Sequence, residues 1–506
     1  MDTSHTRFDK AGVALMHNLH DWRLRAVERV ELSSALWSER HREIHINPMR
    51  EFMRDQSGSP YLEIRRADGG RSVVELLLPI TELPKVPLLD LKITVAGQRV
   101  YRVSKDVSAR IQARYVIELA QRANLLKEDS EDFIDFLTFL FFFPSYPYER
   151  HLRNYNRLFY PAQDDVYIKP ALQFPSREFN AAYREWSTHA RKIRRLAKEY
   201  CITDYASGAE NPLAALPYLF QELRAREPAV ELTVKQVTDL MEYLRGQLEE
   251  AADMVKETQK SSSNPGTQSA TKEKSECARR FLSAYFAYGY RWMAFARCVV
   301  PLDEPFLIEV EEKRAIYFSP GRRLNRKSNL WKRFRKEAWQ MVSVADAETN
   351  HVSIRVTDTA VRLIGRPRVR DELFTDLNEQ VEEEEGTHEL CLRQDSNRER
   401  RERIYIGCRL GLTGIHSWML RLTIVLTLLG IMIMAWRGPA GYLTGNEATV
   451  ILIPVSFSAA FLLAREASTL SARVKIVHQW ILLIELFALL GLSFILLMLG
   501  CLTGKC

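Results

Sequence analysis

Three long apolar runs near the C-terminus constrain this chain more than any other feature, and they lie at 418–436, 448–464 and 480–502. The first run has 19 residues with one charge, Arg421, and the third has 23 residues with one charge, Glu485. A helix of 19 residues spans about 28 Å, close to the thickness of a bilayer's hydrocarbon core. The second run, of 17 residues, is at the short limit for a span. The pattern predicts three transmembrane helices within 412–506, the alternative for each being a buried core helix.

Positive charges in the short loops indicate how these helices lie in the membrane. Arginine and lysine are abundant before the first run and between the second and third runs, and scarce elsewhere near them. The residues that carry this asymmetry are Arg398, Arg400, Arg401, Arg403, Arg409, Arg465, Arg473 and Lys475. Positive loops stay on the cytoplasmic side. We therefore expect a multi-pass protein of the cell (inner) membrane, with a cytoplasmic N-terminal region and an external C-terminus.

Composition and motifs argue against several classes of function. The net charge of +7 over 506 residues is modest, so nucleic acid is not expected as a partner. Seven scattered cysteines with no CxxC pair suit a reduced cytoplasmic domain. There is no GxxxxGK[ST], no GxSxG and no GxGxxG after a strand, and the HxxxH spacing of His41 and His45 falls in a strand-like stretch. We expect no catalytic residues, no cofactor and no metal site.

Hydrophobic periodicity divides the first half of the soluble region into two parts. Residues 1–104 are rich in strand patterns and contain two candidate hairpins, around Asp68-Gly69-Gly70 and Ala96-Gly97. Residues 105–259 change to a helical period. Within them, the stretch 131–143 is apolar almost all round, which favours a buried central helix over a membrane-facing or partner-facing patch. Further helices are expected at 177–200, 212–226 and 234–258.

A linker and a second β-rich part follow. Residues 260–275 consist mainly of Ser, Asn, Pro, Gly and Lys, which predicts a flexible linker that is either a domain boundary or a loop within one helical domain. Residues 276–411 begin as a helix, which becomes a strand near Trp292, and continue as short alternating strands. We expect a β-sandwich-like domain there, directly before the membrane. The soluble region as a whole is predicted to be α+β.

A basic cluster at 321–336 is the strongest candidate for a binding surface, because it interleaves cations with Trp331 and Phe334. Its cations are Arg322, Arg323, Arg326, Lys327, Lys332, Arg333, Arg335 and Lys336. This combination favours an anionic membrane surface. It also suits nucleic acid, and the remaining alternative is a solvated loop or helix face balanced by acids. The acidic block 371–385 is expected to form an exposed loop, or a clamp that masks the basic cluster.

The two charges inside the apolar runs form a second candidate site. With the topology above, Arg421 and Glu485 both lie near the cytoplasmic end of their helices. We predict that they form an intramembrane pair, or that Glu485 reaches Arg465, the alternative being that each side chain extends to the interface. Small residues recur every fourth position in the second run, at Ser456, Ala460 and Ala464, which suits close helix packing.

Three stretches, LLLPITELPKVPLLDLKIT, ETNHVSIRVTD and RIYIGCRLG, follow one another in an order that resembles a group of uncharacterised actinobacterial multi-pass membrane proteins. The resemblance implies a cytosolic mixed α/β region before two or more C-terminal membrane helices, in a bacterial inner membrane. It implies no known activity and no site residues.

The leading interpretation is a non-enzymatic, membrane-anchored sensor, adaptor or scaffold with a cytosolic binding region. Its expected partners are the lipid bilayer, anionic headgroups, and a protein partner or a second copy of the chain. Two alternatives stay open: an oligomeric pore or channel-type effector gated by the soluble region, and an enzyme with an unrecognised site. Liposome permeability and oligomer mass would distinguish the pore from the anchored sensor.

Overall fold

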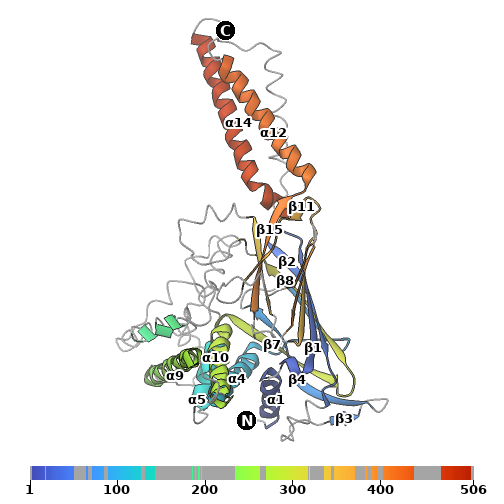
Figure 1. Ribbon diagram of the computed structural model, residues 1–506, viewed down its shortest axis with the longest axis vertical. Helices are drawn as coiled ribbons and strands as arrows, with labels where there is room; N and C mark the ends of the chain where they lie inside the picture. Colours follow the sequence, from blue (N-terminus) through green and yellow to red (C-terminus); the bar gives the residue numbers. More distant parts are fainter. Residues whose placement is uncertain are drawn as a thin grey trace.

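The computed structural model of the chain describes residues 3–17, 19–50, 64–66, 71–84, 89–126, 131–142, 234–261, 269–316, 318, 336–343, 347–370, 382–385, 389–395, 403–437 and 469–502, with a few positions between 185 and 196. These residues form an elongated α+β body, from one end of which two long helices project (Figure 1). The C-terminus lies at the far end of these helices, and the N-terminus lies at the opposite end of the body (Figure 1). The predicted α+β class is confirmed.

The strands form three sheets. The large sheet has eight strands in the order β13-β14-β10-β1-β2-β8-β5-β6. Their bounds are β1 Arg23–Leu32, β2 Trp37–Ile46, β5 Leu89–Val95, β6 Gln98–Val100, β8 Phe306–Ala315, β10 Thr349–Val356, β13 Glu382–Glu385 and β14 Glu389–Asp395. The three-stranded sheet comprises β3 Ile64–Arg66, β4 Ser72–Pro84 and β7 Arg291–Pro301. The four-stranded sheet comprises β9 Glu337–Ser343, β11 Val361–Leu363, β12 Arg368–Arg370 and β15 Arg403–Leu412.

The large sheet combines strands from both β-rich parts of the chain. Strand β1 pairs in parallel with β10, from Arg25 opposite Thr349 to Leu32 opposite Val356. Strand β2 pairs antiparallel with β8 along its whole length. The regions 1–104 and 276–411, expected as separate β structures, therefore share one sheet. Alternation along a strand shows which face is buried but not which distant strand is its neighbour, so this pairing was missed.

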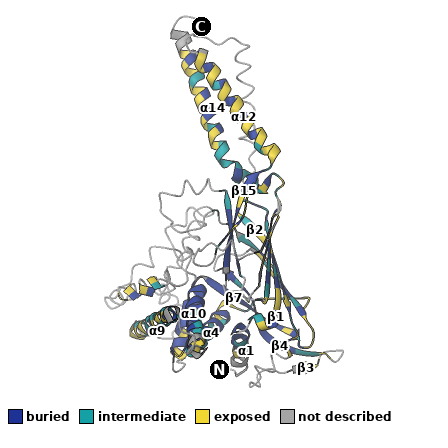
Figure 2. Ribbon diagram, viewed as in Figure 1, coloured by how far each residue is buried: buried dark blue, intermediate teal, exposed yellow. Residues whose placement is uncertain are grey.

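The two smaller sheets cover different halves of the inner face of the large sheet. Near the helical end of the body, apolar side chains of β4 such as Leu76 and Leu78 pack with Ile44, Ile46 and Ile308. Near the projecting helices, a second apolar cluster joins β1 and β10 of the large sheet to β15 and β9 of the four-stranded sheet. Figure 2 shows buried residues along the inside of this double-layered body.

A layer of helices covers the outer face of the three-stranded sheet. These helices are α1 Thr3–His17, α4 Lys105–Arg122, α5 Glu131–Phe142, α9 Val234–Ser261 and α10 Ser269–Tyr290, and the short α2 Leu19–Trp22 leads into β1. They share one apolar cluster with Leu77, Met293 and Phe295, which lie on the opposite face of β4 and β7 from the sandwich core. Strand β7 is therefore buried on both faces over much of its length.

Several local predictions are confirmed. The hairpin β5–β6 turns at Ala96 and Gly97, whose φ angles of 50° and 75° are those of a type I′ turn. Strands β3 and β4 also pair antiparallel, as the hairpin predicted around Asp68-Gly69-Gly70 requires. Helix α5 is buried within the helical layer, with Phe136 and Phe141 fully enclosed. The predicted helix at 212–226, and all of 177–200 except a few helical positions, lie outside the described residues.

Two other expectations are corrected. The ends of the predicted linker 260–275 are helical, because α9 extends to Ser261 and α10 begins at Ser269. Both helices pack in the same apolar cluster, so the link joins neighbours within one layer. Residues 382–385 of the acidic block form the edge strand β13 rather than a loop. Glu382 lies opposite Arg393 of β14, and pairing of the backbone outweighs the mutual repulsion of these glutamates.

Two C-terminal helices have the length and composition of membrane spans. These are α12 Gly414–Arg437 and α14 Leu470–Leu502. In their most apolar windows only 28% and 22% of residues are buried, whereas the core helix of a soluble protein is mostly buried. Helix α14 starts ten residues before the predicted run and is about 50 Å long, and its first turns pack against β15 and β11 of the body. The predicted span at 448–464 lies outside the described residues.

Candidate functional site

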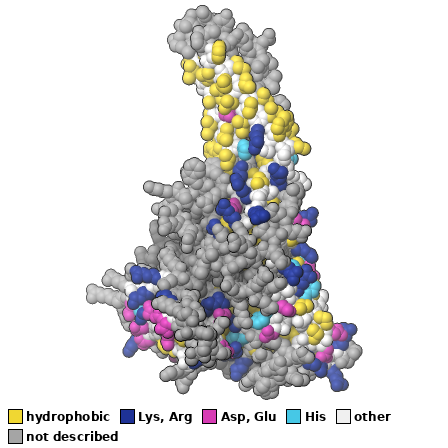
Figure 3. All heavy atoms as spheres, viewed as in Figure 1, with side chains coloured by type: hydrophobic (Ala, Val, Ile, Leu, Met, Phe, Trp, Pro, Cys, Tyr) yellow, Lys and Arg dark blue, Asp and Glu magenta, His cyan; other side chains and the backbone are white. Residues whose placement is uncertain are grey.

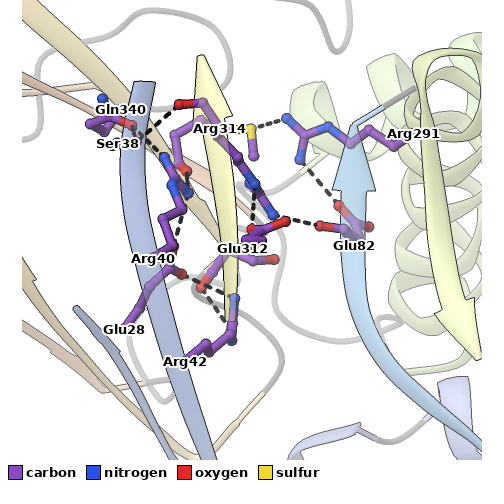
Figure 4. A network of polar contacts seen from close by, with 11 residues as sticks. Glu28, Ser38, Arg40, Arg42, Glu82, Arg291, Glu312, Arg314 and Gln340 are labelled. Atoms are coloured by element: carbon purple, nitrogen blue, oxygen red, sulfur yellow. Dashed lines mark hydrogen bonds and ion pairs between the residues drawn. The ribbon is translucent and has the colours of Figure 1, made fainter. Parts of the chain in front are cut away.

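A layer of buried charged side chains separates the two apolar clusters of the sandwich. The inner face of β2 is apolar at Ile44 and Ile46 and then becomes polar at Ser38, Arg40 and Arg42. The same change occurs on the neighbouring strands, where Glu28 of β1 and Glu312 of β8 point inward and are at most 6% exposed. We call this set, with Glu82, Arg291, Arg314 and Gln340, the charged layer (Figure 4).

One half of the charged layer joins the large sheet to the four-stranded sheet. Glu28 accepts hydrogen bonds from Arg40 at 2.9 Å and from Arg42 at 3.2 Å. Arg40 also donates to Gln340 Oε1 of β9 at 2.5 Å and to the carbonyl oxygen of Met341 at 2.8 Å. Each β2 arginine thus pairs with a carboxylate of its own sheet and reaches across to β9, since Arg42 donates to a carbonyl there as well.

The other half of the charged layer joins the large sheet to the three-stranded sheet. Arg314 Nε lies 2.5 Å from Glu312 Oε1, and Arg314 donates to the carbonyl oxygen of Glu82 at 3.2 Å. The Glu82 carboxylate pairs in turn with Arg291 of β7 at 3.2 Å, and Arg291 also contacts Met341 Sδ. All three sheets therefore meet in this layer, in the gap between the two smaller sheets (Figure 4).

The electrostatics of the charged layer suit a structural link more than a reaction centre. Four arginines face three glutamates, and burial together with the charge of Arg314 lowers the pKa of Arg40 to about 10, so Arg40 stays protonated at neutral pH. Glu312 Oε2 and Gln340 Nε2 have no hydrogen-bond partner among the described residues. Within those residues no group of three or more His, Cys, Asp or Glu is placed to hold a metal ion.

A single turn of the body contacts the residue directly before α12 and the first turn of α14. The turn comprises Asp358–Ala360, between β10 and β11. The carbonyl oxygen of Ala360 accepts a hydrogen bond from Thr413 N at 3.0 Å, and Thr413 is the one residue between β15 and α12. Asp358 Oδ2 accepts from Ser471 N in the first turn of α14 at 2.8 Å. A carboxylate at this position satisfies an otherwise unpaired amide and is favourable beside the positive end of the helix.

Basic side chains gather where the projecting helices meet the body (Figure 3). Lys336 is half-buried there, and burial together with the charge of Arg409 lowers the pKa of its ammonium group. Lys336 and Arg421 both act electrostatically on His478 of α14. We call Lys336, Arg409, Arg421, Arg473, Lys475 and His478 the basic collar.

The structure places few of the residues predicted from sequence to form the binding surface. Of the cluster 321–336, Lys336 alone is described; Arg322, Arg323, Arg326, Lys327, Lys332, Arg333 and Arg335 lie outside the described residues. Arg421 is exposed on α12, and Glu485 is buried on α14 without an ion-pair partner among the described residues. The predicted Arg421–Glu485 pair is therefore not formed. Arg421 instead lies by His478, two helical turns before Glu485.

Sequence reasoning missed the charged layer, although one signal was available. The period of two along 37–46 puts Ser38, Arg40 and Arg42 on the same face as Ile44 and Ile46. If that face is buried, both arginines must be buried and paired. The alternation was used to predict a strand, but the charges on its apolar face were not followed.

None of the family models, curated proteins or solved structures compared with this chain matches it. The resemblance to actinobacterial membrane proteins therefore stays a prediction, and the functional argument rests on the geometry above.

Proposed function

We propose that this protein is a non-enzymatic, membrane-anchored sensor or adaptor, whose cytosolic body passes changes of state to its C-terminal helices. The observation that carries the proposal is the Asp358–Ala360 turn, which binds the starts of both helices. A tether that only holds a domain near a membrane needs no such connection. Here β15 continues into α12 through Thr413 alone. A movement of the four-stranded sheet is therefore transmitted to α12 with no flexible linker between them.

The direction of the helices supports three membrane crossings. Gly430 of α12 lies beside Leu489 of α14, and Met434 lies beside Ser493, so both helices run away from the body. A chain that ends α12 at the far side and begins α14 near the body must return between them, and the apolar run 448–464 is suited to that return. The basic collar supports a cytoplasmic position for the body, in which its cations contact anionic headgroups.

A C-terminal reporter tests this topology. We expect alkaline phosphatase fused after Cys506 to be active in bacterial cells, because an odd number of crossings puts the C-terminus outside. A fusion of the same reporter after Arg437 should also be active, and a fusion after Thr469 should be inactive. Activity of the fusion after Thr469 would show that 438–469 does not return to the cytoplasm, and would remove the three-span topology.

Replacing Asp358 with alanine tests the coupling. We expect the loss of this cap to destabilise the start of α14 by about 0.5–2 kcal/mol. A loss of about 1 kcal/mol speeds amide hydrogen exchange in the first turn of α14 by roughly fivefold. Because the same turn holds β15 through Thr413, exchange should also rise in β15 and β9. The measurement is hydrogen exchange by mass spectrometry on the full chain in lipid nanodiscs.

The matched control is Asp303→Ala. Asp303 also accepts hydrogen bonds from a neighbouring element, through Arg50, but this exposed pair lies at the β7–β8 turn. We expect it to leave exchange in α14 unchanged. If Asp358→Ala affects the first turn of α14 and nothing in the four-stranded sheet, the helices act as an anchor alone and the coupling proposal fails.

An oligomeric pore is the second candidate, and the polar residues Thr423, Thr427 and Glu485 buried between α12 and α14 favour it. The helices of one protomer are too few to enclose a channel, so this function requires several copies. Dye release from liposomes by a complex of measured mass would support it over the anchored sensor.

A further inference from the structure

The buried seam between α12 and α14 is apolar along most of its length. Leu420 and Met434 of α12 and Leu482 and Leu489 of α14 are each at most 2% exposed. The exceptions are Thr423 and Thr427 on α12 and Glu485 on α14. Since Gly430 lies beside Leu489 and the helices are parallel, Glu485 sits four residues earlier, at about the level of Thr427.

Glu485 is enclosed, and no described side chain pairs with its carboxyl group. Its side chain is 7% exposed, and its Oε2 atom is buried with no hydrogen-bond partner among the described residues. The cations of the collar are centred on His478, about two turns closer to the body. An ionised carboxylate is very costly in such surroundings.

The threonines of α12 near the level of Glu485 donate their hydroxyl protons within their own helix. Thr423 donates its hydroxyl proton to the carbonyl oxygen of Met419 at 2.9 Å, and Thr427 donates to that of Thr423 at 2.9 Å. With their protons used in this way, neither hydroxyl group can donate a hydrogen bond to a carboxylate. A carboxylate would therefore receive no hydrogen bond from them, whereas a protonated carboxyl has an O–H group to donate. The seam is complementary to the neutral acid.

We infer that Glu485 is a proton-binding site within the membrane, protonated when α12 and α14 are packed and reached from the cytoplasmic side past His478. His478 lies on the same face of α14, seven residues before Glu485, and its Nδ1 atom is buried without a partner among the described residues. Lys336 and Arg421 are the charged groups that act on His478. Loss of the proton would bring water or a cation to Glu485 and loosen the helix pair. This inference rests on the proposed membrane anchoring.

Labelling with dicyclohexylcarbodiimide tests the inference, because this apolar reagent captures protonated carboxyls inside membranes as a stable acylurea. The full chain would be reconstituted in sealed phosphatidylcholine and phosphatidylglycerol vesicles and treated between about pH 5 and about pH 9. We expect one adduct, mapped by mass spectrometry to Glu485, absent from the isosteric variant Glu485→Gln. Its yield should fall about tenfold for each unit of pH once the carboxyl ionises. A water-soluble carbodiimide should not label this residue.

A pH difference across the vesicle membrane tests the route. In vesicles whose protein orientation is determined by protease digestion, the labelling of Glu485 should follow the pH on the side of the body. Labelling that follows the opposite side would overturn the access route, and no labelling at any pH would overturn the site. Retention in the membrane after carbonate extraction is scored separately. If carbonate extraction removes the protein from the membrane, the proposed anchoring is wrong. If the protein is retained but Glu485 is not labelled, only this inference is wrong.

Discussion

Replacing Glu28 with glutamine is expected to lower the free energy of unfolding by about 3–5 kcal/mol. Glu28 is 5% exposed and accepts hydrogen bonds from both Arg40 and Arg42. The amide keeps the shape of the side chain but removes its charge, so two buried guanidinium groups lose their shared counterion. The remaining carboxylates of the charged layer belong to other pairs, with Glu312 beside Arg314 and Glu82 beside Arg291.

Urea unfolding of the full chain in detergent micelles, followed by tryptophan fluorescence, measures this change. The matched control is Glu311→Gln, on the strand β8 that also carries Glu312. Glu311 pairs with Lys92 at 2.9 Å, but both side chains are about half exposed. An exposed pair contributes about 0–1 kcal/mol. Equal effects of the two substitutions would mean that the charged layer is solvated, and its role in joining the three sheets would be lost.

Replacing Gly407 with alanine is expected to cost about 1–3 kcal/mol, because the added methyl group overpacks a closed contact. Gly407 lies in the middle of β15, and a Cβ atom there would lie 2.7 Å from the ring of Trp339. The ring has little space to retreat, since Trp339 is 3% exposed and Arg370 lies over it at 5.4 Å from the centroid. The strain should also loosen β15, which leads directly into α12.

Gly411→Ala on the same strand is the control for Gly407→Ala. A Cβ at Gly411 would clash with Cδ1 of Ile364 and lie 2.7 Å from its Cγ1, but this side chain is 38% exposed and can rotate about its Cα–Cβ bond into solvent. Thermal unfolding of both variants should show a clearly lower melting temperature for Gly407→Ala alone. If Gly411→Ala is the more damaging of the two, side-chain freedom is not what separates these positions and the packing argument fails.

Local features of the fold were predictable because their causes are local. The apolar stretch at α5, the Ala96-Gly97 turn and the change from helix to strand at Arg291 all depend on neighbouring residues. The local sequence pattern did not predict an element correctly where that element depends on a partner distant in the chain. Residues 382–385 form a strand because β14 pairs with them, and α14 begins at Leu470 because Thr469 and Asp358 cap it.

The candidate site shows the same division. Sequence identified Glu485 as unusual, since a carboxyl is rare in an apolar run. The predicted pair with Arg421 is not formed, and Arg465, the other predicted partner, lies outside the described residues. Arg421 and Glu485 both lie within apolar runs, yet the packing of α12 against α14 directs Arg421 to the surface and Glu485 into the seam. The position of a residue in the sequence determines how far along a helix pair it lies. The packing of the two helices determines whether its side chain points to the surface or into the contact between them.

The sequence by itself determined that the chain ends in long apolar helices, that an α+β region precedes them, and that positive charges gather between the two. These properties follow from composition and period, which act over a few turns or strands. Only the tertiary structure decided that β1 and β2 join β8 and β10 in one sheet, that three sheets meet at a buried charged layer, and that the Asp358–Ala360 turn holds both helices. Each of these three features joins residues that are far apart in the chain. Such residues come together only when all the strands and helices bury their apolar faces at the same time.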